Sequence, residues 1–178
     1  MAASLKNTGH EGLAQFDHFL EEFPRYLRGQ RGLSENTERI YMADLQSFRQ
    51  YLAAEELGLT DMDRQTLRGY LAWLATEGRG GQQGYARVSV ARKLTVVRSF
   101  YRFLVQEGLF RSTPVPSGQS FKVKVAKTLP DFLGQREVAR LMDAPDGSTV
   151  HGIRDKAILE TLYASGVRLA EIHGLNLA

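Results

Sequence analysis

The sequence predicts an all-α protein, and three observations support this prediction. Apolar residues recur at spacings of three and four through most of residues 11–110, which is the periodicity of a helix with one buried face. The same stretch lacks the apolar–polar alternation that is typical of strands. Gly, Pro and helix-capping residues interrupt it where helices would begin and end. We therefore expect residues 11–110 to form a bundle of four helices.

The first two expected helices are separated by Gly32. The apolar face of the first is formed, at spacings of 3,4,3,4, by Leu13, Phe16, Leu20, Phe23 and Leu27. Ser34 is expected to cap the second helix by accepting a hydrogen bond from a free backbone N–H. The apolar face of this second helix consists of Tyr41, Leu45, Phe48 and Leu52.

The third expected helix is shorter, and Asp63 is its candidate cap. Its apolar side is formed by Leu67, Leu71 and Leu74. Four glycines in "EGRGGQQG" (77–84) predict a loop after it. The fourth helix is expected from about Ser89 to Glu107, with Gly108 as its end. Its apolar face consists of Val90, Leu94, Val97, Tyr101 and Leu104.

Residues 111–130 change in character, since three prolines and alternating lysines favour an extended linker. "KVKVAK" within it is compatible with a short strand or with a basic segment lying along phosphates. Two further helices are expected at 134–145 and 151–165, and another begins around Arg168 after Gly166. The expected organisation is a flexible N-terminus (1–10), a helical domain (11–110), a linker (111–130) and the start of a second domain (131–178).

Composition excludes several classes of protein. The chain has 178 residues and no cysteine, so it has neither a disulfide framework nor a cysteine-based zinc site. Its four histidines lack metal-ligand spacing, and no Gly-rich phosphate loop of the GxxxxGK type occurs. No apolar run is long enough to span a bilayer, and the N-terminus lacks the layout of a signal peptide. We expect a cytoplasmic protein without a membrane segment, metal or other cofactor.

The net charge of +3 conceals a strong asymmetry along the chain. Residues 1–77 have a balance of −4 and residues 131–178 a balance of −2. Residues 78–130 carry ten basic side chains against Glu107 alone, a balance of +9. A block so uniform in sign favours an anionic partner, and nucleic acid is the leading candidate. A basic face that contacts only solvent is the alternative.

Several polar and basic residues are candidate contacts to duplex DNA. On the expected fourth helix, Arg98 and Arg102 lie on one flank of the apolar stripe, and Arg87 joins them if the helix extends that far. Lys93 projects from the other side, and Arg92 points away from the stripe. Arginine suits guanine or a phosphate, and lysine suits a phosphate. Short polar side chains in the first turn of a helix also suit phosphate, although simple capping explains them equally well. The remaining candidates are Asn36, Thr37, Ser89, Lys122 and Lys124.

Arg168 is a candidate for anion binding because a Gly-containing break places it at the start of a new helix. Its planar guanidinium has five donors that suit phosphate oxygens. Glu171 lies one helical turn away and could orient or partly neutralise it. The local sequence alone favours a surface ion pair of little energetic value over a catalytic role.

Four segments, taken together and in this order, are similar to the tyrosine recombinase (phage integrase) family, most of all to its Xer type. The first two resemble helices of the family's core-binding domain, the third the entry to its catalytic domain, and the fourth its first catalytic box. These segments are "RGLSENTERIYMADLQSF", "SVARKLTVVRSFYRFLVQEG", "LPDFLGQREVARLMDAP" and "IRDKAILETLYASGVRLAEIHGLNL".

The resemblance implies a C-shaped clamp around duplex DNA. Residues 11–110 would form a SAM-like core-binding domain whose second and fourth helices face the major groove, and the first helices of a catalytic domain would follow. Arg168 would be the first catalytic arginine, holding the scissile phosphate, and Glu171 would support it. The family's nucleophile is a tyrosine that forms a 3′-phosphotyrosyl link, without metal or nucleotide. Chromosome dimer resolution would be the biological role.

Two departures from the family pattern qualify these expectations. The sequence stops ten residues after Arg168, and none of its seven tyrosines matches the nucleophile. We therefore expect this polypeptide to bind DNA without cleaving it and to be monomeric, whereas full-length relatives work as tetramers on two DNA sites, in some cases with a second recombinase. Gly134 replaces the usual Ser or Thr cap, and His173 replaces an apolar residue.

Three alternatives remain open from the sequence. A phage or mobile-element integrase usually has an extra domain before the core-binding one, and only about ten residues precede the first expected helix here. A non-catalytic DNA-binding regulator derived from a recombinase would share the same helical domain. A helical interaction module without nucleic acid is disfavoured by the basic block at residues 78–130.

Overall fold

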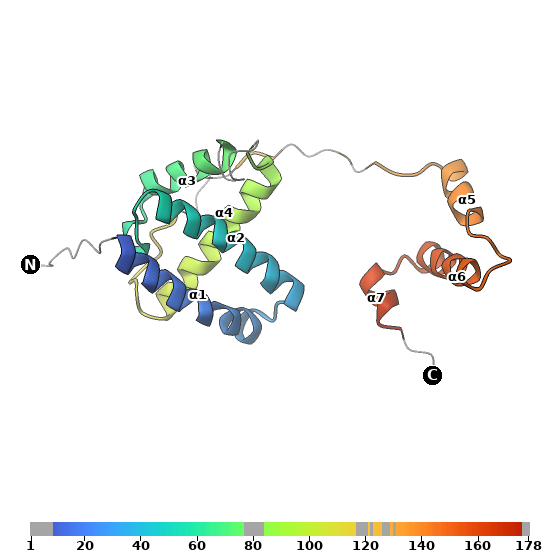
Figure 1. The fold of residues 1–178 in the computed structure, drawn as a ribbon, viewed down its shortest axis with the longest axis horizontal. Helices are drawn as coiled ribbons and strands as arrows, with labels where there is room; N and C mark the ends of the chain where they lie inside the picture. Colours follow the sequence, from blue (N-terminus) through green and yellow to red (C-terminus); the bar gives the residue numbers. More distant parts are fainter. Residues whose placement is uncertain are drawn as a thin grey trace, which may run out of the picture. The chain divides into compact units, whose positions relative to one another are not determined.

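The computed structural model forms two compact units, residues 1–126 and 127–178, each of which is described by itself (Figure 1). The regular elements of the described residues are all helical, which confirms the predicted fold class. The structure describes residues 9–76, 84–116, 121, 123–125, 129 and 131–175.

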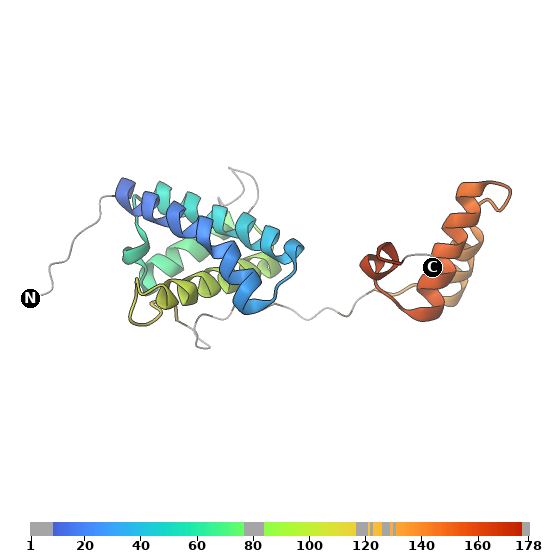
Figure 2. The same cartoon turned by 90° about the horizontal axis from the view of Figure 1, so that it is seen from below.

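In the described part of the first unit, four α-helices and the short 3-10 helix η1 lie side by side (Figures 1 and 2). Helix α1 contacts α2, η1 and α4, while α3 contacts both α2 and α4. The four-helix bundle expected for residues 11–110 is therefore present, and α4 begins two residues earlier than the sequence suggested. The elements are α1 (Gly9–Arg31), α2 (Glu35–Ala54), η1 (Leu59–Asp61), α3 (Arg64–Thr76) and α4 (Arg87–Gln106).

Aromatic side chains fill the centre of this bundle. The ring of Phe100 on α4 lies 5.3 Å from that of Phe16 and 5.2 Å from that of Phe23, both on α1. Phe48 on α2 lies 5.0 Å from Tyr70 on α3, also centroid to centroid. All five side chains are fully buried. Burial of each large apolar side chain contributes on the order of 2 kcal/mol, so these contacts account for much of the bundle's stability.

The turns of the first unit follow the expected capping chemistry. Ser34 Oγ accepts a hydrogen bond from the backbone N–H of Thr37 at 3.4 Å and so caps α2. Asp63 Oδ1 accepts one from the N–H of Thr66 at 2.7 Å at the start of α3. Gly32 after α1 and Gly108 after α4 have φ angles of +55° and +80°, a region that glycine enters without steric cost.

Part of the expected linker packs onto the bundle. Val115 and Phe121 are only 2% and 5% exposed and belong to the same apolar core as α1–α4. The extended linker predicted for residues 111–130 is therefore not free along its whole length, because these two apolar side chains bury against the helices. Among the described residues of "KVKVAK", 123–125 lie in neither a helix nor a strand.

The second unit consists of α5 (Gln135–Asp143), α6 (Val150–Ser165) and the short α7 (Leu169–His173). Helix α6 contacts both of the others. Thr149 Oγ1 caps α6 by accepting the N–H of Gly152 at 3.0 Å, and Gly166 ends that helix with a φ of +64°. The expected break between α6 and α7 is thus present.

Many apolar side chains of the second unit are exposed. Ile153, Tyr163 and Leu169 are 59%, 70% and 73% accessible to solvent, and Gly152 is the one buried residue of its three helices within the described part. Three short helices have too little apolar surface in mutual contact to form a core like that of the bundle.

Candidate nucleic-acid interface

The outward face of α4 carries exposed basic side chains. Arg87 in the first turn and Arg102 near the C-terminal end are both exposed, as is Thr95 between them. The Arg102 Nε–H donates to the carbonyl oxygen of Arg98 at 3.3 Å, which leaves the Nη groups outside that bond. Val88 in the first turn is 63% exposed, so the same face also presents an apolar group.

Arg98 lies on the expected flank of α4, yet it faces the chain that follows the bundle. Its Nε and Nη2 groups donate to the carbonyl oxygen of Pro116 at 3.1 and 2.8 Å, and Nη2 also donates to that of Phe121 at 3.3 Å. Burial, and to a lesser extent the nearby charge of Arg102, lowers the pKa of the Arg98 guanidinium. Its geometry is that of a clamp on the carbonyls of residues 116 and 121 rather than of a free cation.

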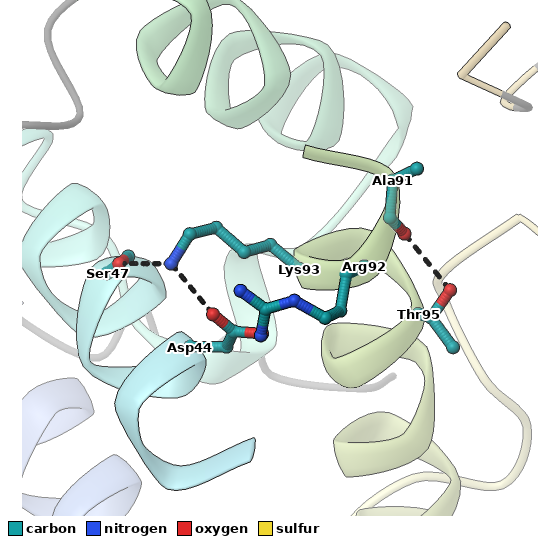
Figure 3. A network of polar contacts seen from close by, with 6 residues as sticks. All are labelled: Asp44, Ser47, Ala91, Arg92, Lys93 and Thr95. Atoms are coloured by element: carbon teal, nitrogen blue, oxygen red, sulfur yellow. Dashed lines mark hydrogen bonds and ion pairs between the residues drawn. The ribbon is translucent and has the colours of Figure 1, made fainter. Parts of the chain in front are cut away.

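A polar network joins α2 to α4 inside the bundle (Figure 3). The Nζ ammonium of Lys93 donates to Asp44 Oδ1 at 2.9 Å and to Ser47 Oγ at 2.8 Å. It also lies 4.4 Å from the centroid of the Tyr85 ring. Asp44, Ser47 and Lys93 are 3%, 5% and 3% exposed, so this ion pair is removed from solvent.

The expected DNA contact by Lys93 does not fit this geometry. Its side chain points into the bundle instead of away from it, and the acceptors there use the ammonium's hydrogen-bonding capacity. The physical reason is Asp44, whose carboxylate on the facing side of α2 is buried and is stabilised there by the Lys93 ammonium.

Arg92 is bonded to the other oxygen of the same carboxylate. Its Nη1 group donates to Asp44 Oδ2 (Figure 3). Its side chain stays 45% exposed. Asp44 therefore lies between two cations, one buried and one at the surface. The guanidinium of Arg92 retains N–H donors beyond the one in that bond.

The first turn of α2 also carries its expected polar groups. Asn36 is exposed, and its Oδ1 accepts a hydrogen bond from Arg39 Nη2 at 3.0 Å. The hydroxyl of Thr37 lies 3.0 Å from that of Ser34, and its backbone N–H takes part in the cap. Thr37 therefore takes part in the cap of α2, while Asn36 beside it is exposed.

The other candidate DNA contacts of residues 78–130 are Ser89, Lys124 and Lys122. Ser89 is half-buried in the first turn of α4, and Lys124 is exposed after the bundle. Lys122 lies outside the described residues.

Arg168 and Glu171 form the capping arrangement of α7 in the second unit. The backbone N–H of Arg168 donates to Glu171 Oε2 at 2.7 Å, and its Nη1 group lies 3.3 Å from Oε1. The two side chains are 86% and 53% exposed. Arg168 stands at the N-cap position, so the expectation that it opens a helix is confirmed, and its guanidinium is open to solvent.

No cluster of His, Cys, Asp or Glu within the described ranges has the arrangement of a metal site. No helix in that same part of the chain is both long and apolar enough to cross a membrane.

Comparison with known families identifies the helical domain. The profile described as "Phage integrase, N-terminal SAM-like domain" matches residues 20–108, which cover α1 from its middle through α4. The chain belongs to the phage integrase family. The resemblance to tyrosine recombinases that the sequence segments suggested is thereby confirmed, and the basic face of α4 lies within the matched domain of this integrase-family chain.

Several curated integrase-family relatives are similar over most of this chain. Tyrosine recombinase XerC of Myxococcus xanthus is 40% identical over 159 residues, which are 89% of this chain and 50% of the relative. Tyrosine recombinase XerD of Shewanella oneidensis is 36% identical over 163 residues, or 92% and 52%. XerD of Staphylococcus aureus is 33% identical over 159 residues, or 89% and 51%.

The chain spans about half the length of these curated relatives. The expected similarity to the Xer type is confirmed by their names and identities. No solved structure gives a significant match to the chain.

Sequence reasoning missed Asp44 as a central residue of this integrase-family domain. Asp44 lies three residues after Tyr41 and four before Phe48, which places it on the apolar face of α2. Two signals were available in the sequence: the carboxylate of Asp44 on the buried face of α2, and Lys93 next to the buried Leu94 on α4. Together they predict a buried ion pair between the two helices.

Proposed function

We propose that this chain binds duplex DNA as the core-binding part of a site-specific tyrosine recombinase. The observation that carries the proposal is the exposed basic face of α4 inside the matched integrase domain. It belongs to a stretch with a charge balance of +9, which would repel itself without an anionic partner or solvent screening. The repeating phosphates of DNA supply such a partner.

The proposed interface lies on α4 and the first turn of α2. Exposed arginines suit guanine edges or phosphates, and short polar side chains at a helix start suit phosphates. Arg98 and Lys93 bond to other parts of the protein, Arg98 to the carbonyl of Pro116 and Lys93 to Asp44 and Ser47. They would act at the interface only through these contacts. The proposed contacts are Arg87, Ser89, Arg92, Arg102, Asn36, Thr37 and Lys124, together with Lys122 outside the described residues.

In the second unit, we propose that Arg168 holds a DNA phosphate. Its guanidinium is 86% exposed and carries donors in a planar fork. In strand cleavage by the whole recombinase, such donors would stabilise the negative charge that develops on the phosphate oxygens. Glu171 would orient the guanidinium through its 3.3 Å contact. A tyrosine nucleophile would form the 3′-phosphotyrosyl link, with neither metal nor nucleotide.

The whole protein would act in the cytoplasm, in chromosome dimer resolution. It would work as a tetramer on two DNA sites, together with a second recombinase. Similarity to XerC and XerD proteins supports this role over that of a phage or mobile-element integrase. A non-catalytic DNA-binding regulator is the second candidate function, which the same basic helix would serve.

Two assays test the proposal with a polypeptide of residues 1–178. In a gel-shift assay, duplex DNA should be retarded, and polyglutamate at equal charge should compete weakly. Failure to retard any duplex at low salt would refute DNA binding. With a nicked duplex that traps covalent intermediates, we expect no adduct, because none of the seven tyrosines matches the family's nucleophile. A covalent band would show that residues 1–178 already contain a nucleophile.

A further inference from the structure

The buried network between α2 and α4 has a consequence for the surface that carries Arg92. Asp44 has one negative charge and two oxygens in separate ion pairs, Oδ1 with Lys93 and Oδ2 with Arg92. The three side chains therefore sum to one positive charge. Because Lys93 is 3% exposed and Arg92 is 45% exposed at its side chain, the excess charge is accessible at Arg92.

We propose that Lys93 is a positioning residue that keeps the charge and donors of Arg92 available to a DNA phosphate. This inference rests on the proposed DNA binding and concerns how one cation of that interface is maintained. Lys93 itself is buried and does not touch the nucleic acid. It acts by bonding Asp44 Oδ1 and compensating the charge of the carboxylate, while Arg92 makes a single hydrogen bond, to Oδ2.

The chemistry of the guanidinium explains why this matters. A carboxylate with no other partner tends to engage arginine through two parallel N–H···O bonds, and the resulting pair has no net charge. Arg49 shows that arrangement in this chain, since its Nε and Nη2 groups both bond Asp17, at 2.6 Å each. At Asp44 the arrangement differs, because Lys93 bonds Oδ1 and Arg92 makes one bond, to Oδ2.

The burial of Lys93 makes the arrangement rigid. Its ammonium has three donors, which are directed to Asp44, Ser47 and the face of Tyr85. A buried carboxylate that loses its partner is costly, so Asp44 stays paired. The partner of Arg92 at Oδ2 is thus held in place from inside the bundle.

The test is the salt dependence of binding to a fluorescently labelled duplex of mixed sequence, measured by anisotropy with the 178-residue chain. Lys93→Gln removes the charge but keeps a side chain with N–H donors. We expect the slope of log K against log[salt] to fall by about 0.9, the value for one phosphate contact. Affinity at 0.1 M salt should fall on the order of five- to tenfold. Arg92→Ala should give a similar loss.

A charge-restoring double variant separates this role from a merely structural one. Asp44→Asn combined with Lys93→Gln leaves no charge inside the network and returns the positive charge to Arg92. We expect this double variant to recover the wild-type slope. Lys156→Gln, which removes an exposed lysine of the second unit, serves as the matched control and should leave the slope unchanged.

The outcomes distinguish the inference from the proposed function. Absence of wild-type binding would refute the proposed function. If the wild type binds DNA, an unchanged salt slope in Lys93→Gln would overturn only the positioning role. An unchanged slope in Arg92→Ala would do the same. Lack of recovery in a folded double variant would also overturn it. If Lys93→Gln does not fold by circular dichroism, Lys93→Met replaces it, and the uncharged double variant still gives the decisive comparison with Arg92→Ala.

Discussion

Arg98 on α4 donates two hydrogen bonds to the carbonyl oxygen of Pro116, at 3.1 and 2.8 Å. A third bond reaches the carbonyl of Phe121, whose ring lies 5.6 Å from the guanidinium carbons of both Arg64 and Arg68. The chain after the bundle is therefore held by cations from α3 and α4. An arginine that looked like a DNA contact in the sequence instead determines where this chain leaves the bundle.

Replacing Arg98 by Ala should weaken the folded bundle. The charge-assisted hydrogen bonds to residues 116 and 121 would be lost, with an expected cost of about 1–3 kcal/mol in the free energy of unfolding. Urea denaturation measures this change, and limited proteolysis should show faster cleavage after Arg111. Unchanged stability with unchanged proteolysis would contradict the clamp.

Replacing Arg102 by Ala should leave the stability of the bundle almost unchanged and lower its affinity for DNA. This side chain is exposed, and its described bond reaches the carbonyl one turn earlier, so the free energy of unfolding should change by less than about 0.5 kcal/mol. DNA affinity should fall, and the salt slope should decrease by about 0.9. Loss of stability without loss of affinity would contradict the assignment.

Two buried tyrosines give a matched pair of stability tests. Tyr101 Oη donates to the carbonyl of Leu59 at 2.9 Å, whereas Tyr70 Oη has no hydrogen-bond partner among the described residues. Both hydroxyls are buried, and burial raises the pKa of each tyrosine. Tyr101→Phe should cost about 1–2 kcal/mol because it leaves that carbonyl without its donor.

Tyr70→Phe should be nearly neutral or stabilising, since it removes a buried hydroxyl that lacks a partner. Thermal unfolding of the two variants under the same conditions makes the comparison. Equal losses of stability in both variants would show that the Leu59 bond has no special weight.

The ion pair between Asp17 and Arg49 should make part of the stability depend on pH. The hydrogen bonds from Arg49 lower the pKa of Asp17 below its ordinary value of 3.8. Because the folded-state pKa is the lower one, the stabilisation is present above the unfolded-state pKa and is lost as pH falls through the folded-state value.

Asp17→Asn should therefore be less stable than the wild type at pH 7 by about 0.5–1 kcal/mol, the scale for a partly exposed pair. The difference should shrink as the pH falls through the lowered folded-state pKa of Asp17, because the carboxyl then becomes protonated in both states. Urea denaturation of both proteins across this range measures it. A difference that grows on acidification would contradict the pairing.

Much of the fold could be predicted from the sequence because helix periodicity and capping are local. Gly32, Ser34 and Asp63 mark helix ends by their own chemistry, and the apolar spacing of α1–α4 shows which faces are buried. The break at Gly166 likewise placed Arg168 at the start of α7.

The candidate interface was harder to predict because the direction of a long side chain depends on its partner. Lys93 and Arg98 lie at the expected positions of α4. The side chain of Lys93 bonds Asp44 inside the bundle, and that of Arg98 bonds the carbonyls of residues 116 and 121. These partners are 18 or more residues away in the sequence, so helix periodicity does not show them. Exposed Arg87 and Arg102 have no such constraint among the described contacts and lie as expected.

The most direct test of the central claim is the binding constant of the 178-residue chain for duplex DNA as a function of salt concentration. A basic face that contacts several phosphates predicts a linear fall of log K with log[salt], with a slope of about −0.9 for each contact. We expect a slope between about −3 and −6 for the wild type, since the exposed candidates on α2 and α4 are few. Binding that does not depend on salt, or no binding at 0.05 M salt, would contradict the account.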